Sequence, residues 1–76
     1  MAKSKLLTPK KKQHFRSRED LVDFMTKSGW QPEGEGTNPN TKELGNGFRD
    51  KSTGAWIVVY ACPVADGVKV TDIARL

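Results

Sequence analysis

The basic charge of this chain is concentrated at its N-terminus, and this limits how much of the chain can form a core. The first sixteen residues carry six Lys or Arg and no acid, whereas the remaining sixty carry seven bases and nine acids. Because the lysines repel one another, residues 1–14 are predicted to form a flexible basic arm. Residues 15–76 then form one small domain, near the lower limit for folding without disulfides or metal, so a homodimer is a further expectation.

Cysteine and histidine usage excludes several kinds of site. Cys62 and His14 are the only residues of their types, so neither an intramolecular disulfide nor a zinc site with four cysteine or histidine ligands can form. We therefore expect no metal, no cofactor and a reducing, cytoplasmic location. The longest apolar run, 55–65, is too short to span a membrane, and only Leu6 and Leu7 stand where a secretion signal needs a longer apolar stretch.

One helix is predicted to begin after Ser17 and to end before Gly29. The Ser17 hydroxyl can accept a hydrogen bond from the amide of Asp20, and acidic residues in the first turn complement the helix dipole. The apolar stripe of this helix consists of Leu21, Phe24 and Met25. Gly29 can adopt the left-handed conformation that ends helices, with Trp30 folding back on the last turn.

Residues 31–41 read QPEGEGTNPNT and contain no aliphatic side chain. The segment cannot bury apolar surface, and it is dense in Gly, Pro and Asn. We therefore predict a long mobile loop inside the domain. A loop ordered by a partner and an idle loop have the same composition, so its role stays open.

Three strands are predicted after this loop. The strongest is 55–61, AWIVVYA, which consists of β-branched and aromatic residues flanked by alanines. A turn at 50–54 pairs it with roughly 44–49, although Asn46-Gly47 offers a competing turn and leaves the register open. The alternation in 68–73 indicates an edge strand. The predicted fold class is α+β: one N-terminal helix packed on a three-stranded antiparallel meander (α-β-β-β), with a flexible basic N-terminal arm.

A single helix covers only one face of such a sheet. If Ile57 and Val59 pack under the helix, the alternation puts Trp56 and Tyr60 on the other face, with Lys69 beside them. The first functional hypothesis is nucleic-acid binding without catalysis, in which lysines neutralise phosphates and the two rings stack on unpaired RNA or DNA bases. The predicted binding residues are Lys3, Lys5, Lys10, Lys11, Lys12, Arg16, Arg49, Lys51, Trp56, Tyr60 and Lys69.

Simpler interpretations stand beside this hypothesis. A basic run is more often a solubilising tail, and an aromatic residue in a small domain more often belongs to the core or to a dimer interface. The second hypothesis is a small regulator or inhibitor, of the type that phages and mobile elements encode, which binds an acidic host protein through its sheet face or edge strand. An enzyme is not expected, because His14 has no evident catalytic partner. A nuclease that uses His14 is the third and last hypothesis.

One family resemblance rests on the middle of the chain. The helix ending at 27–30 (KSGW), followed by a hairpin with 48–50 (FRD) and 53–54 (TG), resembles the first part of HicA-type toxins. Those small RNA-cleaving proteins have a double-stranded-RNA-binding-like fold, so the resemblance implies a surface suited to RNA or protein. Their catalytic histidine lies in a Gly-Ser-His stretch, where this chain has Gly45-Asn46-Gly47, and 71–76 is too short for their closing helix. No residue and no activity is carried over.

Overall fold

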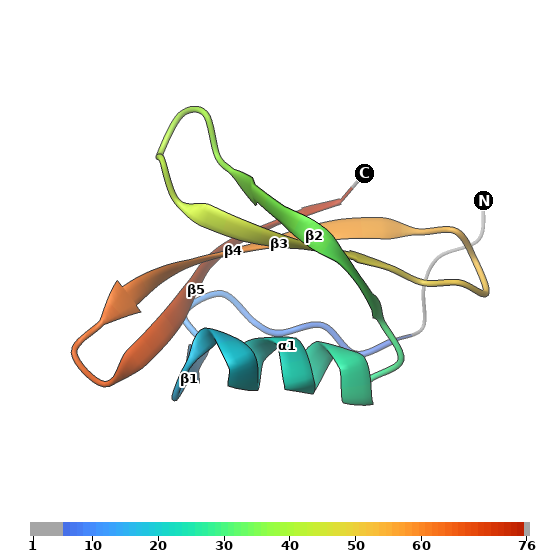
Figure 1. Ribbon diagram of the computed structural model, residues 1–76, viewed down its shortest axis with the longest axis horizontal. Helices are drawn as coiled ribbons and strands as arrows, with labels where there is room; N and C mark the ends of the chain where they lie inside the picture. The colour runs from blue at the N-terminus through green and yellow to red at the C-terminus, as the bar shows by residue number, and fades with distance from the viewer. Residues whose placement is uncertain (1–5, 76) are drawn as a thin grey trace.

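The computed structural model describes residues 6–75, which form one antiparallel sheet of five strands with a single helix on one face (Figure 1). The elements in chain order are β1 (His14–Phe15), α1 (Arg18–Lys27), β2 (Gln31–Thr37), β3 (Leu44–Arg49), β4 (Trp56–Val64) and β5 (Gly67–Arg75). The strand order in the sheet is β1-β5-β4-β3-β2, so β2 to β5 form a meander and β1 pairs with the far side of β5. Within the described residues, no helix is long and apolar enough to cross a membrane.

The predicted three-stranded meander is wrong, because the sheet has two further strands. β2 lies within the segment 31–41 that was predicted to be a mobile loop, and it pairs antiparallel with β3, with a bulge at Glu33. Its side chains are largely exposed, so it joins the sheet through backbone hydrogen bonds and not through apolar burial. β1 has only two residues, His14 and Phe15, which pair with Lys69 and Val68 of β5.

The helix begins and ends where the sequence predicts. Ser17 is the N-cap, and its hydroxyl accepts a hydrogen bond from the Asp20 amide at 3.2 Å. Gly29 has a φ of 110°, and the Trp30 amide donates to the Met25 carbonyl at 3.0 Å. Between α1 and the sheet lies the buried core of Leu21, Met25, Trp30, Phe48, Ile57, Val59, Ala61, Val68 and Val70.

The turn between β3 and β4 resolves the register that the sequence left open. The Asp50 amide donates to the Ala55 carbonyl at 2.8 Å, and the Gly54 amide donates to the Asp50 carbonyl at 2.7 Å. Gly54 has a φ of 75°, a conformation that glycine adopts without a Cβ penalty. The competing turn at Asn46-Gly47 does not form, and both residues lie inside β3.

The N-terminal segment lies against the fold from Leu6 onward, which differs from the flexible arm of the predicted fold class. Leu6 packs against the core, and the Leu7 carbonyl accepts a hydrogen bond from Trp30 Nε1 at 2.8 Å. Farther along, the Lys12 amide donates to the Val70 carbonyl at 2.7 Å. Hydrogen bonds from its backbone to Trp30 and to β5 therefore hold this segment in place. A lysine-rich sequence gives no sign of such bonds. Residues 1–5, with Lys3 and Lys5, lie outside the described part, and a domain boundary at residue 15 stays a prediction.

Candidate nucleic-acid interface

The sheet face opposite α1, here called the outer face, carries the aromatic residues singled out in the sequence. On β4, Ile57 and Val59 are buried in the core, so the alternation of the strand directs Trp56, Val58 and Tyr60 to the outer face. This confirms the predicted assignment of the two faces. No element of the described chain covers the outer face, which is the upper side of the sheet in Figure 1.

At one end of the outer face, the Arg49 guanidinium lies over the Trp56 ring. The two residues are opposite each other on β3 and β4, and the Arg49 guanidinium carbon lies 5.8 Å from the centroid of the indole. Arg49 Nε is also 3.1 Å from Oε1 of Glu33, an ion-pair distance without hydrogen-bond alignment. Trp56 remains 37% exposed. A cation at this distance from an indole is attracted to the face of the ring.

In the middle of the outer face, the Tyr60 ring lies over a glycine of the neighbouring strand. Gly45 is opposite Tyr60, and a Cβ built on Gly45 would lie 2.6 Å from Cδ1 of the ring. Gly45 is buried by this contact, while Tyr60 itself is only half-buried. The ring is therefore held against the sheet backbone and keeps an accessible side.

Cations lie along the β5 side of the outer face. Lys69 is exposed. It pairs with Cys62 of β4 on one side and with His14 of β1 on the other. Residues 10–13 form a turn beside β5, closed by the Gln13 amide donating to the Lys10 carbonyl at 3.1 Å. Lys11 belongs to this turn, and its Nζ lies 3.7 Å from Oδ1 of Asp72. Asp72 of β5 pairs with Tyr60 of β4.

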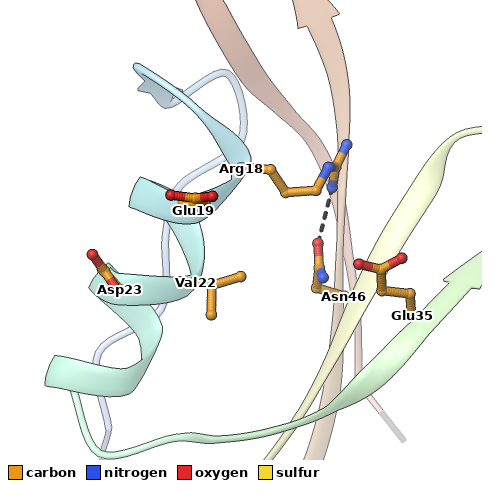
Figure 2. A pocket seen from close by; sticks show the side chains of 6 residues that line it. All are labelled: Arg18, Glu19, Val22, Asp23, Glu35 and Asn46. Atoms are coloured by element: carbon orange, nitrogen blue, oxygen red, sulfur yellow. Dashed lines mark hydrogen bonds between the residues drawn. The ribbon is translucent and has the colours of Figure 1, made fainter.

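The helix side of the sheet has the opposite charge. A pocket of about 420 Å³ lies between α1 and the strands, and Figure 2 shows the carboxylates of Glu19, Asp23 and Glu35 around it. Arg18 is engaged inside the protein: its guanidinium donates to Asn46 Oδ1 at 2.9 Å and to the Ala61 carbonyl at 3.2 Å. Arg18 therefore links α1 to the sheet and does not extend a cationic rim.

His14, weighed as a nuclease group, lies beside an aspartate that the sequence did not indicate, and the single cysteine is partly buried. His14 Nε2 is 3.0 Å from Oδ1 of Asp66, and both side chains are well exposed to solvent. Cys62 is a free, half-buried cysteine on β4. Among residues 6–75, no group of three or more His, Cys, Asp or Glu side chains is placed to hold a metal ion.

The structure brings together part of the predicted binding set. Arg49, Trp56, Tyr60 and Lys69 share the outer face, and Lys11 reaches its rim through Asp72. Lys10 and Lys12 are exposed on the turn beside β5, Lys51 is exposed in the turn after β3, and Arg16 is exposed between β1 and α1. Lys3 and Lys5 cannot be placed, because they lie outside the described residues.

Sequence reasoning missed the glycines of this face. Gly45 and Gly47 are on the outer side of β3, and they pair with Gly36 and Gly34 of β2. The available signal was the spacing Gly-x-Gly in both segments, since a period of two puts both glycines on one face of a strand. From composition, Gly34 and Gly36 are instead predicted to lie in a loop, and Gly47 in a competing turn.

No protein-family model, no curated protein and no solved structure matches this chain. The topology also differs from what the HicA-type resemblance implies. Four strands follow α1, and β5 runs to Arg75, where that fold has a closing helix.

Proposed function

We propose that this protein binds single-stranded nucleic acid on the outer face, without catalysis. The observation that carries the proposal is the grouping of Trp56, Tyr60 and Arg49 on a sheet face that no other described element covers. Bases stack on aromatic rings and on guanidinium planes, and each stacked base contributes about 1–3 kcal/mol. The single cysteine, Cys62, supports a reducing, cytoplasmic setting for this activity.

The spacing of the rings suits an extended strand. Trp56 and Tyr60 are four residues apart on β4, which corresponds to about 13 Å along a β-strand. An unstacked single strand can span that distance with two or three nucleotides. Lys69 at one end of the face can then neutralise a phosphate, while Arg49 at the other end would have to exchange Glu33 for a phosphate to do the same.

The test is a titration of a labelled single-stranded oligonucleotide at several salt concentrations. Log affinity is expected to fall linearly with log salt, and Lys69→Ala should reduce the slope by about 0.7 because it removes one phosphate contact. Lys27→Ala is the matched control, since Lys27 is an exposed lysine in the last turn of α1, on the other side of the molecule. Its slope should equal that of the wild type.

Tryptophan fluorescence locates the contact within the same titration. Trp30 is 2% exposed and Trp56 is 37% exposed, so quenching by a stacked base should arise from Trp56. Trp56→Phe should abolish the quenching and retain most of the affinity, whereas Trp56→Ala should weaken binding. No binding up to about 100 µM protein at low salt, the range of weak non-specific complexes, would refute the proposal.

A second function has one observation in its favour. β1 pairs with β5 only at Val68 and Lys69, so within the described chain residues 71–75 have no strand on that side. In this case the protein is a small regulator, and its target, an acidic host protein, adds a strand at this edge. Binding of this kind should survive moderate salt and depend on the backbone of β5, not on Lys69.

A further inference from the structure

The pocket on the helix side is large enough to hold a ligand. Its volume of about 420 Å³ lies within the range of about 300–1,000 Å³ that is usual for ligand pockets. Residues of α1 form one wall, and Glu35 of β2 and Asn46 of β3, which are opposite each other in the sheet, form the other wall. Nucleic-acid binding on the outer face does not use this pocket.

Asn46 presents a hydrogen-bond donor without a partner on the sheet wall of the pocket. Its Oδ1 accepts from Arg18, which can only donate, so Nδ2 is the free branch of the amide (Figure 2). Within the described residues Nδ2 has no hydrogen-bond partner, although Asn46 is only 6% exposed. Buried polar groups are nearly always paired in native proteins. A ligand with a carbonyl or carboxylate oxygen would therefore complete the hydrogen bonding of Asn46.

Three carboxylates border the same pocket without a cationic partner. Glu19 and Asp23 are four residues apart on α1, a spacing that puts them on one face of the helix and at which like charges oppose helix formation. Glu35 faces them from β2. The ion pairs of residues 6–75 lie elsewhere, and Lys27, one turn beyond Asp23, forms none of them. The fold therefore leaves these three negative charges for solvent or for a ligand.

The charge of the pocket selects an organic cation. Among the described residues Arg18 is the only cation that borders it, and its guanidinium already donates to three acceptors of the sheet. Three negative charges against one positive charge leave the pocket with a charge of −2. These carboxylates do not form a group that could hold a metal ion, within the part of the chain that the structure describes. They are therefore better suited to a cation that extends over several atoms.

We propose that this pocket binds an arginine side chain of a partner polypeptide, independently of any nucleic acid on the outer face. The guanidinium lies among Glu19, Asp23 and Glu35, and its planar fork of donors bonds to more than one carboxylate. A backbone carbonyl beside the bound arginine accepts a hydrogen bond from Asn46 Nδ2. The methylene groups of the arginine pack on Val22, the apolar residue of the lining.

Charge and shape limit what else can occupy the pocket. A phosphate chain is repelled by the three carboxylates. The basic turn at 10–13 of a second copy has the right charge, but the Gln13 amide closes it onto the Lys10 carbonyl, and the Lys12 amide donates to Val70 of β5. That turn cannot enter the pocket as an extended segment. A segment of another protein, with its backbone free, can do so.

The test is an NMR titration of the isotope-labelled protein at low salt with two capped tripeptides. One is acetyl-Gly-Arg-Gly-amide, and the other has citrulline, the uncharged isostere of arginine, in the middle. The arginine peptide should shift the side-chain amide signals of Asn46, because Nδ2 gains an acceptor. The citrulline peptide should bind at least about tenfold more weakly, since its hydrogen bonds to the carboxylates are not assisted by charge.

A pair of double variants assigns the binding to the pocket. Asp23→Asn/Glu35→Gln removes two carboxylates that border the pocket, whereas Asp20→Asn/Glu43→Gln removes the same charge at residues that do not. All four side chains are at least partly exposed, so both variants should fold, which circular dichroism checks. Exposed ion pairs change affinity by about two- to fivefold each, so the pocket variant should raise the Kd of the arginine peptide about tenfold. The control should stay within twofold of the wild type.

Each outcome decides for or against the pocket. An Asn46 shift that the arginine peptide produces in the wild type and the control, but not in the pocket variant, supports the inference. No shift up to about 10 mM peptide, a weaker complex than any specific site would form, overturns it. Equal binding of the two peptides, or equal loss in the two variants, also overturns it. If ultracentrifugation finds a dimer that the pocket variant converts to monomers, the occupant is a second copy and not a partner protein.

Discussion

Replacing Arg18 by Met should destabilise the protein strongly, although Arg18 lies in the first turn of a surface helix. Its guanidinium donates to Asn46 Oδ1 at 2.9 Å, to the Ala61 carbonyl at 3.2 Å and to the Leu44 carbonyl at 3.5 Å. Hydrogen bonds to a charged group contribute about 1.5–3 kcal/mol each when they are well formed, and Asn46 is only 6% exposed, so water replaces its lost partner poorly.

The net loss is smaller than the sum of these bonds. The third bond is long, and a cation in the first turn opposes the helix dipole by about 0.3–1 kcal/mol, which Met removes. A net loss of about 2.5 kcal/mol remains. For a domain of this size it lowers the melting temperature by about 10–20 °C, at about 4–8 °C per kcal/mol.

Urea unfolding followed by circular dichroism measures this loss, with Arg18→Met, Asn46→Leu and the double variant in one cycle. The double variant should lose less than the sum of the single variants, since removing both partners leaves no buried Asn oxygen unpaired. A loss below about 0.5 kcal/mol for Arg18→Met, the usual range for surface substitutions, would refute the reasoning. Additive losses in the cycle would show that the two side chains are not coupled.

Three further substitutions test the fold. Ser17→Ala removes the N-cap acceptor of α1 and should cost about 1 kcal/mol, measured by urea unfolding. Met25→Ala opens a cavity at a fully buried position and should cost about 2–5 kcal/mol by the same measurement. Gly67→Ala puts a Cβ against the backbone of Phe15 and Arg16, so β1 should detach, and the Val70 amide, which donates to the Gln13 carbonyl, should exchange its hydrogen faster. Unchanged exchange at Val70 would show that the turn at 10–13 holds the segment without β1.

The sequence predicts those elements whose stability comes from side chains. The Ser17 cap, the apolar stripe of α1 and the β-branched run of β4 each use residue types that favour one conformation, and all three form as expected. β2 could not be predicted in this way, because its residues contribute backbone hydrogen bonds to β3 and almost no burial. Glycine and proline within it resemble a loop, and only the presence of β3 beside it makes the extended conformation favourable.

The candidate site was predictable to the same extent. The alternation along β4 gives the outer position of Trp56 and Tyr60, because a strand has a period of two residues. The neighbours of these rings depend on the register between strands, which hydrophobic alternation alone left open between two turns. Register decides that Arg49 is opposite Trp56 and that Gly45 is opposite Tyr60. The position of the glycines on the outer face follows from those pairings and not from any local motif.

The arrangement of charge explains how one small sheet can present two different surfaces. Glu19, Asp23 and Glu35 border the pocket on the helix side, whereas the outer face carries Lys69 and two ion pairs, Arg49 with Glu33 and Lys11 with Asp72. At physiological ionic strength the Debye length is about 8 Å, and a helix packed on a sheet separates its charges from the far face by about 10 Å or more. For the proposed binding of a phosphate chain to the outer face, Glu19 and Asp23 of α1 are therefore largely screened, whereas Glu35 lies on β2 within the sheet itself. The same chain approaching the helix side meets three acids and an Arg18 that is already engaged. The net charge of +4 does not describe this difference between the faces, which under the proposed function would favour the outer face for a polyanion.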